Sequence, residues 1–163
     1  PMLAVATHAL ARLAEDGYVP DAVLILQPPS PLRRLASIRE AVRLLADNDS
    51  VCSVAPLPKA QCPHYLMQVT PAGFLDYFMP DGRRFQRRQD VPQAYFRDGS
   101  IFLTRTTVLL TQGDFYGQRC VPLLIPYEDA LNIDDLADWE EAERRLVQEE
   151  QELYGRIVAH QTV

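Results

Sequence analysis

Residues 21–27 read DAVLILQ, and the segment PPSP follows at residues 28–31. The run is apolar on both faces over the length of one strand, which is typical of a strand buried in a parallel sheet. Three prolines in the next four residues predict a rigid loop. We therefore expect residues 21–27 to form a buried strand with a rigid loop at its carboxyl end.

The segments on either side of this run predict alternating helices and strands. Apolar residues recur at helical spacing within residues 2–16, and Gly17 is a natural end for that helix. A second helix follows the loop, and residues 51–57 form the next strand. This order predicts a right-handed crossover in an open α/β sheet, in which ligands bind outside the carboxyl ends of the strands. The apolar face expected for the second helix consists of Ile38, Val42 and Leu45.

The middle of the chain, about residues 61–98, departs from this pattern. Two short apolar runs at 65–69 and 74–78 flank the turn sequence TPAG at 70–73. Runs of this kind on either side of a turn containing glycine predict a β-hairpin. We expect an insertion in the α/β sheet that serves as a lid or a dimerisation arm.

The last third of the chain returns to the α/β pattern. Residues 100–104 and 121–125 have strand character, and the final helix starts near residue 134 and runs past Leu146. Acidic residues that precede basic ones by four positions stabilise exposed helices, so we expect the charges of this helix to form a solvated face. The pairs with this spacing are Glu140–Arg144 and Glu141–Arg145.

Composition limits the class of protein. The chain has 163 residues, 47% of them hydrophobic, and a formal net charge of −6, which suits one soluble domain that binds neither membranes nor nucleic acid. The N-terminal residues lack the basic region and the cleavage site of a signal peptide, so none is expected. Cys52, Cys62 and Cys120 form no pair with metal-binding spacing, so we expect free thiols and a cytoplasmic location.

The loop at residues 27–33 contains the first group of candidate ligand-binding side chains. Gln27 offers a donor and an acceptor at the strand end, and Ser30 can bind a ligand or cap the next helix. Arg33 offers a planar fork for a carboxylate or phosphate. The alternative interpretation is a rigid turn whose polar residues are structural.

A cluster of arginines forms the second group. Four arginines fall at residues 83–88, and Gln89 and Asp90 follow. This positive charge in an acidic chain suggests a compact anionic ligand. The alternative is an exposed hairpin edge whose arginines pair with nearby acids.

An acidic segment before the last helix forms the third group. Asn132 and Asp134 are alternate residues and would point the same way on an extended segment, so they could share one ligand. Two oxygen ligands beside substrate phosphates are typical of Mg²⁺ sites. The alternative is a helix N-terminus capped by Asp134 or Asp135.

Four motifs in this order resemble those of one family. They are LQPPSPLR at 26–33, similar to LQPTSPLR; RQDVPQAY at 88–95, similar to RQ-x-x-P-x-A-Y; DGSIF at 98–102, similar to NGAIY; and NID at 132–134 with Asp138–Trp139 and Ala142–Glu143, similar to a DID…DW..AE ending. Together they resemble the acylneuraminate cytidylyltransferases, or CMP-sialic acid synthetases, and their relatives for bacterial nonulosonic acids. The resemblance extends from about His8 to Glu143.

This resemblance implies a fold and a reaction. The fold is a Rossmann-like, doubly wound, mostly parallel sheet of the nucleotide-diphospho-sugar transferase type, with residues 1–163 as one domain that dimerises. The reaction is cytidylyl transfer from CTP to a sialic-acid-like 2-keto sugar acid, in which the anomeric hydroxyl attacks the α-phosphorus and pyrophosphate leaves. Mg²⁺ would neutralise phosphate charge, so positioning and electrostatics dominate.

The resemblance also suggests roles for individual residues. Asn132 and Asp134 correspond to the catalytic, metal-binding pair. Arg88 corresponds to an arginine that meets the sugar carboxylate. Together with the residue-level arguments above, the expected substrate-binding set is Gln27, Ser30, Arg33, Arg88, Gln89, Phe102, Phe115 and Tyr116.

The chain also departs from the motifs. Pro29 replaces a threonine, Phe102 replaces a tyrosine, Tyr65 stands about where many members have a lysine, and Asn132 replaces the first aspartate of the metal pair. The family begins with a strand and a Gly/Lys/Arg-rich loop that binds the CTP phosphates, and residues 1–163 contain no match to it. We therefore predict that this N-terminally truncated chain is inactive alone.

Two other functions stay open at this stage. One is a related cytidylyltransferase that acts on an eight-carbon keto sugar acid, against which the Phe115–Tyr116 pair argues mildly because that pair suits an acyl group. The other is a non-catalytic sugar-binding or dimerisation module that retains the fold.

Overall fold

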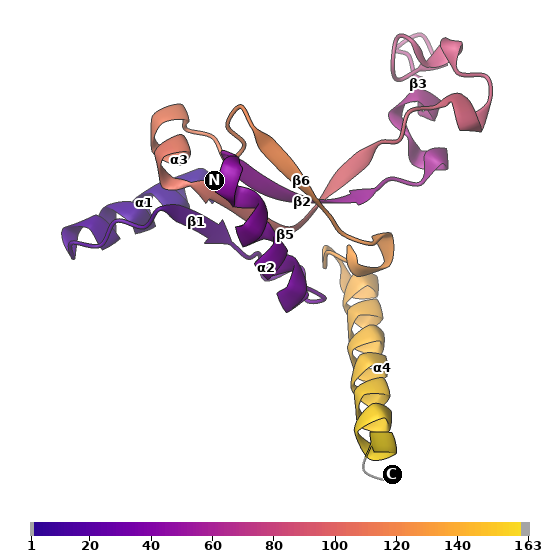
Figure 1. Cartoon of the computed structure of the whole chain (residues 1–163). Helices are drawn as coiled ribbons and strands as arrows, with labels where there is room; N and C mark the ends of the chain where they lie inside the picture. The colour runs from indigo at the N-terminus through magenta and orange to yellow at the C-terminus, as the bar shows by residue number, and fades with distance from the viewer. Residues whose placement is uncertain (1, 161–163) are drawn as a thin grey trace.

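The central element of the protein is a four-stranded sheet with the order β1-β5-β2-β6 (Figure 1). The computed structural model describes residues 2–160, with side chains through Glu152. Strand β5 is antiparallel to both of its neighbours, β1 and β2, whereas β2 and β6 are parallel. The strands are β1 (Ala22–Ile25), β2 (Ser50–Pro56), β5 (Tyr95–Arg105) and β6 (Cys120–Leu124).

The expected open α/β sheet is confirmed, but the sheet is mixed. Strands β1, β2 and β6 run in one direction, and β5 runs between β1 and β2 in the other. The expectation of a buried parallel strand at residues 21–27 is wrong in two respects. Among the described residues β1 pairs only with β5, and Leu24 is 37% exposed. An apolar run indicates that both faces of a strand pack against other elements. It does not indicate whether the neighbouring strand is parallel or antiparallel, because the connection that leads into that strand sets its direction.

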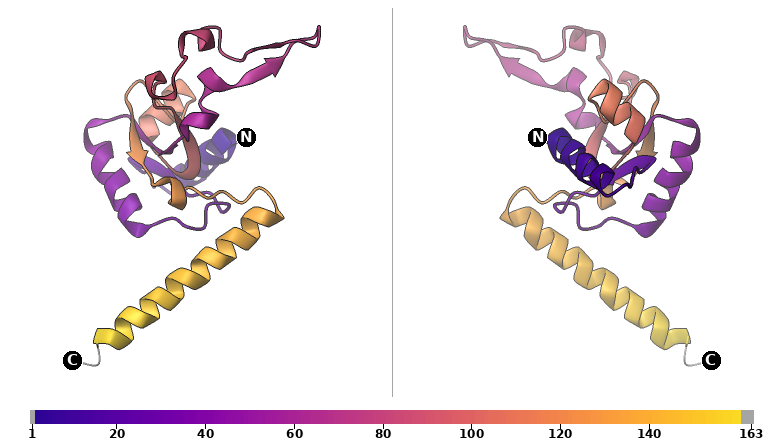
Figure 2. Two further views of the ribbon diagram at one scale, coloured as in Figure 1. Left: turned by 90° about the vertical axis from the view of Figure 1, so that its right-hand side faces the viewer. Right: turned by 90° about the vertical axis from the view of Figure 1, so that its left-hand side faces the viewer.

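Helices cover both faces of the sheet (Figure 2). On one face, α2 (Leu35–Leu44) packs over β2, β5 and β6. On the other face, α1 (Met2–Glu15) and α3 (Thr106–Gln112) pack over β1. The core on the α2 side consists of Ala41, Leu45, Val51, Ile101, Leu103, Leu123 and Ile125. The core on the other side is built around Ala6, Leu10 and Leu109.

The buried face of α2 differs from the one expected. Ala41 is fully buried, and Ile38 packs against the same core, but Val42 is 59% exposed. A rotation of about 100° per residue separates the two positions, so a face centred on Ala41 turns Val42 toward solvent. Alanine gives a weak hydrophobic signal in a sequence, although it allows close packing of a helix on a sheet.

Residues 57–94 form an arm that leaves the sheet between β2 and β5 (Figure 1). A backbone hydrogen bond from Leu57 N to Ala94 O, 2.8 Å long, closes its base. The expected hairpin is confirmed, because β3 (Met67–Val69) and β4 (Leu75–Tyr77) pair in antiparallel fashion. Short 3-10 helices within the arm span Lys59–Gln61, Pro63–Tyr65, Gly82–Arg84 and Arg88–Asp90.

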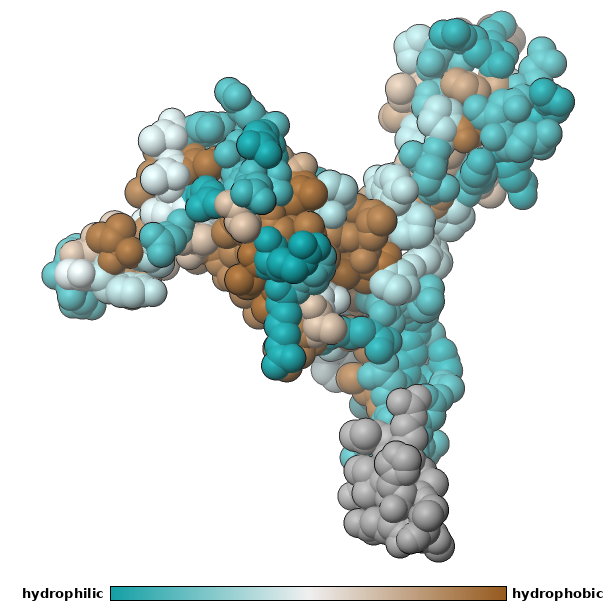
Figure 3. All heavy atoms as spheres, viewed as in Figure 1, coloured by the Kyte–Doolittle hydropathy of each residue, from teal (hydrophilic) through white to brown (hydrophobic). Residues whose placement is uncertain are grey.

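A long helix, α4 (Leu136–His160), ends the described chain and projects away from the sheet (Figures 1 and 2). Figure 3 shows that apolar residues gather over the central sheet, whereas the arm and residues 136–152 of α4 are mainly hydrophilic in that view. None of the described helices combines the length and the apolar character that crossing a membrane requires. Two further 3-10 helices, Leu45–Asp47 and Tyr127–Asp129, follow α2 and β6.

Candidate functional site

The loop after β1 is held by hydrogen bonds to main-chain groups. Arg33 Nε donates to Ser100 O at 2.8 Å, and its Nη2 donates to Gln27 O at 2.6 Å. Ser30 N donates to Gln27 O at 3.3 Å and closes a turn. Arg33 therefore fixes the shape of the loop, and these donors do not face a ligand.

The segment before α4 lies directly against this loop. Ile133 N donates to Pro29 O at 2.8 Å, and Ser30 Oγ donates to Asn132 Oδ1 at 3.3 Å. Asn132 Nδ2 in turn donates to Asp134 Oδ1 at 2.9 Å. Two regions about a hundred residues apart in sequence are thus joined, and the side chains of Asn132 and Asp134 lie on one side of their segment, as the alternation predicted.

The helix N-terminus uses different aspartates. Asp138 N donates to Asp135 Oδ1 at 3.0 Å, and Asp138 Oδ2 accepts from Asp134 N at 3.0 Å and from Asp135 N at 3.2 Å. This reciprocal arrangement is a capping box. Because Asp135 and Asp138 cap the helix, the carboxylate of Asp134 is not needed for capping and stays available to the site. The helix-capping interpretation therefore applies to Asp135 and Asp138, and the ligand-binding interpretation stays open for Asp134.

Two cavities open where these loops meet. The larger has a volume of about 450 Å³, and the other has about 380 Å³. They share Phe96, Asn132 and Asp134 as lining residues, so they adjoin. Gln27, Phe102, Asn132 and Asp134 are the predicted site residues that line the larger cavity.

A residue outside the predicted set, Asp98, also lines the larger cavity. It is only 4% exposed, and its Oδ1 is buried without a hydrogen-bond partner among the described residues. The next residue, Gly99, has φ +79°, and a Cβ there would lie 3.2 Å from Gln27 Oε1 and 3.7 Å from Asn132 Oδ1. The turn at 98–99 therefore packs closely on both loops. Position 98 carries an aspartate where the resembled motif NGAIY has an asparagine. This difference is the signal in the sequence that could have identified Asp98 as a candidate site residue.

The chemistry of this cavity suits a hard cation. Carboxylate and amide oxygens are the ligands that Mg²⁺ and Ca²⁺ prefer, and a buried carboxylate oxygen without a donor favours a positive ligand. No group of three His, Cys, Asp or Glu side chains suited to a metal ion occurs within the part of the chain that the structure describes. Among the lining residues, the side chains that carry oxygen are the carboxylates of Asp98 and Asp134 and the amides of Gln27 and Asn132.

The three aromatic residues expected to bind substrate lie in different places. Phe102 is 7% exposed and lines the larger cavity, with its ring 6.4 Å from that of Phe115. Phe115 packs against the core under α1. Tyr116 accepts a hydrogen bond from Arg97 through its hydroxyl oxygen. Neither Phe115 nor Tyr116 lines the two cavities.

The arginine cluster lies on the arm. Arg88 and Gln89 are exposed in a 3-10 helix of the arm, and neither lines the two cavities. Arg83 pairs with Asp76 at 3.1 Å, and Arg87 pairs with Asp90 at 3.0 Å, all four being well exposed. The structure therefore brings Gln27 and Asp134 together but leaves Arg88 apart from them in this chain.

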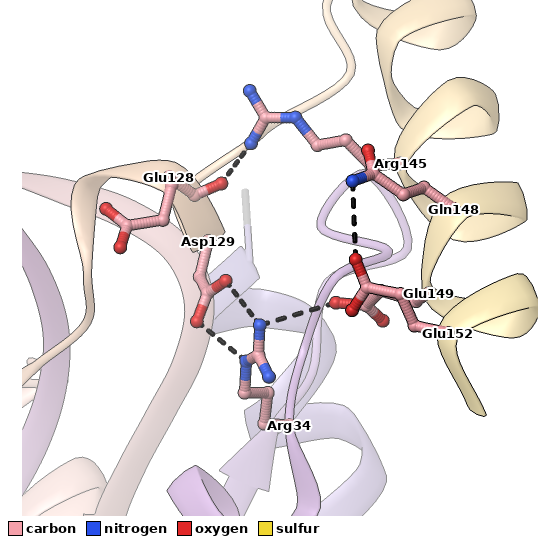
Figure 4. Close-up of polar contacts among 7 residues, drawn as sticks. All are labelled: Arg34, Glu128, Asp129, Arg145, Gln148, Glu149 and Glu152. Carbon is pink, nitrogen blue, oxygen red and sulfur yellow. Dashed lines mark hydrogen bonds and ion pairs between the residues drawn. The ribbon is translucent and has the colours of Figure 1, made fainter. Parts of the chain in front are cut away.

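One ion pair and one hydrogen bond connect α4 to the segments before α2 and after β6 (Figure 4). Arg34 makes two hydrogen bonds of 2.7 Å to Asp129, which raise the pKa of Arg34, and a longer contact of 3.3 Å to Glu149. Arg145 donates to Glu128 O. The charges of α4 are thus only partly solvated, because Arg145 bonds Glu128 O and Glu149 contacts the Arg34 that pairs with residue 129.

The charged pairs within α4 differ from those expected. Glu141 accepts from both Arg144, at 2.7 Å, and Arg145, at 2.6 Å, and these bonds lower the pKa of Glu141 to about 2. The expected Glu141–Arg145 pair is confirmed, but Arg144 bonds Glu141 and not Glu140. Both arginines reach the same carboxylate because residues three and four apart are neighbours on a helix.

The thiols are structural. Cys52, Cys62 and Cys120 are free, as expected, and the first two are buried. Burial raises the pKa of the Cys52 thiol to about 12, with smaller contributions from Cys120 and the nearby Asp98 carboxylate. Cys52 therefore stays protonated and unreactive.

Comparison with known proteins places the chain among distant relatives. No protein-family model matches it. It is 27% identical over 117 residues to the N-acylneuraminate cytidylyltransferase of Escherichia coli O18:K1:H7, covering 71% of this chain and 27% of that protein. It is 28% identical over 123 residues to the CMP-N,N'-diacetyllegionaminic acid synthase of Legionella pneumophila, covering 73% of this chain and 51% of that protein.

A third relative has the same kind of name. The N-acylneuraminate cytidylyltransferase of Streptococcus agalactiae serotype V is 28% identical over 119 residues, which cover 71% of this chain and 28% of that protein. The chain thus spans about half the length of these relatives, or less. The resemblance inferred from the motifs is confirmed: this chain is a distant relative of proteins named as CMP-sialic acid and CMP-legionaminic acid cytidylyltransferases.

Proposed function

We propose that this chain forms the sugar-acid and cation-binding part of an enzyme that transfers a cytidylyl group from CTP to a sialic-acid-like 2-keto sugar acid. The observation that carries the proposal is the junction of two loops at one cavity, made by the Ser30–Asn132 and Ile133–Pro29 hydrogen bonds. The names of the distant relatives support the same reaction class.

In this proposal each side chain has a physical task. Gln27 donates to and accepts from sugar hydroxyl groups at the end of β1, and Phe102 provides an apolar wall. Asn132 and Asp134 hold Mg²⁺, which neutralises phosphate charge when it is bound. Ser30, buried and hydrogen-bonded to Asn132, keeps the two loops in register. Polar groups that are already held in position by the fold need no reorganisation when the reaction occurs.

The nucleotide requires positive charge that these cavities offer only sparsely. Each of them is lined by one arginine, Arg97 in the larger and Arg145 in the smaller. Both guanidinium groups already donate elsewhere, to Tyr116 and to Glu128 O. We therefore propose that residues 1–163 alone bind the sugar acid but turn over CTP slowly or not at all.

The arm contributes a second part of the proposal, a homodimer. Its hairpin exposes apolar side chains that are 42–72% accessible in this chain. In this proposal they meet the same side chains of a second copy, because apolar side chains that gather in an exposed patch mark protein interfaces. The residues concerned are Leu66, Met67, Val69, Phe74, Leu75 and Phe78.

Calorimetric titration of residues 1–163 with keto sugar acids tests the sugar site. We expect a nine-carbon sugar acid to bind, and Gln27→Ala to weaken it about tenfold, the equivalent of one net hydrogen bond. Gln68→Ala, an exposed glutamine on the arm, is the matched control and should bind as the parent does. Equal affinity of the two variants would contradict the proposal.

A second candidate is a sugar-binding module without catalysis. Asn132 favours it, because an amide supplies no charge where the resembled motif has an aspartate. A pyrophosphate-release assay with CTP and the same sugar acids, including an eight-carbon one, separates the two. Sugar binding without binding of CTP or release of pyrophosphate would support the module.

A further inference from the structure

Asp98 is a buried acid whose environment is incomplete. Its residue is 4% exposed, and its Oδ1 has no hydrogen-bond partner among the described residues. Removing an ionised carboxylate from water is costly unless a donor or a cation compensates. A group left in this condition in an otherwise hydrogen-bonded site points to a ligand.

The neighbouring arginines already have other partners. Arg97, the adjacent residue, donates to the Tyr116 hydroxyl and lies over its ring. Arg33 donates to the carbonyl oxygens of Ser100 and Gln27. Among the side chains that the structure describes, none bonds to Asp98 as a counter-charge.

The position of Asp98 shows where the counter-charge would lie. Asp98, Asn132 and Asp134 line one cavity, and the Cβ position of Gly99 is 3.7 Å from Asn132 Oδ1. Asn132 is itself fixed, because Ser30 Oγ donates to its Oδ1 and its Nδ2 donates to Asp134. Residues with oxygen-bearing side chains from two segments thus line one cavity.

The sequence shows an exchange at two of these positions. The motifs that this chain resembles, NGAIY and DID, have an amide at the first position and an acid at the second. This chain has Asp98 and Asn132, so acid and amide are interchanged while the number of carboxylates at the three positions is unchanged. Cation affinity depends on the number of charged ligands, so such an exchange preserves the charge of the site.

We propose that Asp98 supplies the negative charge that Asn132 lacks, and that Asp98, Asn132 and Asp134 together bind one divalent cation. This inference deepens the proposed function, because it assigns a ligand to the cation of the same site. An all-oxygen set favours Mg²⁺, Mn²⁺ or Ca²⁺ over Zn²⁺.

Titration of the purified chain with Mn²⁺, followed by electron paramagnetic resonance, tests the ligand set without nucleotide or sugar. We expect Asp98→Asn to weaken Mn²⁺ binding about tenfold or more, because one of two carboxylates is lost. Asp47→Asn removes the same charge from an exposed acid on another part of the chain and should bind Mn²⁺ as the parent does.

The exchange of the two residues is the more stringent test. Asn132→Asp alone should bind Mn²⁺ more tightly than the parent, and Asp98→Asn combined with Asn132→Asp should regain parental affinity. Thermal unfolding followed by circular dichroism shows which variants are folded, and Asn132→Asp, made at a partly buried position in a segment outside the helices and strands, remains informative if Asp98→Asn does not fold.

Two results would overturn the inference. One is parental Mn²⁺ affinity in Asp98→Asn, which would mean that Asp98 contributes no ligand. The other is absence of Mn²⁺ binding in the parent chain. The first result overturns the role of Asp98 alone, whereas the second also overturns the cation part of the proposed function. Failure of the sugar titration described above, with Mn²⁺ binding intact, would overturn the sugar part of the proposed function and leave this inference standing.

Discussion

The cavity at the end of the sheet and the arm use similar side chains in different ways. In the loop beside the cavity, Ser30 and Arg33 bond to groups from distant parts of the chain, and Ser30 is 3% exposed. On the arm, Arg83 and Arg87 pair with acids within seven residues, and all of these side chains are at least 44% exposed. Buried bonds between distant segments fix geometry, whereas exposed local pairs contribute little.

This difference shows that prominence in the sequence and burial in the structure are separate properties of a charged residue. The arginine cluster is the most prominent charge pattern in the sequence, yet the structure places it on an exposed arm. Asp98 is inconspicuous in the sequence, yet it is the buried carboxylate of the cavity. Burial changes the energetic consequence of a charge more than local clustering does.

The largest expected contrast is between apolar residues of the two regions. Ile101→Ala, at a fully buried core position, should lower the free energy of unfolding by about 2 to 5 kcal/mol. Leu75 is 69% exposed on the arm, so Leu75→Ala should change the free energy of unfolding by less than about 0.5 kcal/mol at protein concentrations too low for association. Urea denaturation measures both values.

The same leucine variant also tests the proposed dimer. If the arm mediates association, Leu75→Ala should raise the dimer dissociation constant measured by sedimentation equilibrium, and Ile101→Ala should affect it less. Stability that depends on protein concentration in the parent but not in Leu75→Ala would agree with this. A parent chain that stays monomeric at all concentrations would contradict it.

A smaller contrast is expected between two arginines. Arg33→Lys loses the planar fork that bonds two carbonyl oxygens, so it should cost about 2 kcal/mol of stability and weaken sugar-acid binding. Arg83→Lys, in an exposed ion pair on the arm, should cost less than about 1 kcal/mol. Similar losses in both would show that the loop is not fixed by Arg33.

The smallest effect concerns the surface of α4. The folded-state pKa of Glu141 is lowered from 4.5 to about 2, so its stabilising contribution is present above pH 4.5 and is lost as the pH falls toward 2. Glu141→Gln should therefore make the unfolding temperature less dependent on pH in that range. Glu140→Gln is the matched control and should keep the pH dependence of the parent. If the unfolding temperature of Glu140→Gln varied with pH as little as that of Glu141→Gln, the assignment of this pH dependence to Glu141 would be contradicted.

The sequence predicted the elements that depend on local pattern. Helical spacing located the first helix almost to the residue, and the turn sequence TPAG located the hairpin, because the period of apolar residues follows directly from backbone geometry. The motifs also identified distant relatives, and they indicated the strand-end loop and the Asn132–Asp134 segment as parts of one site.

The tertiary structure decided what local pattern cannot express. It made β5 antiparallel, turned Val42 to solvent, assigned helix capping to Asp135 and Asp138, and buried Asp98 beside Asn132. Each of these depends on which distant segment becomes a neighbour, and that choice is made by the packing of the whole core. A sequence window reports the faces of an element, whereas the burial and partners of a polar group arise only when the chain has folded around it.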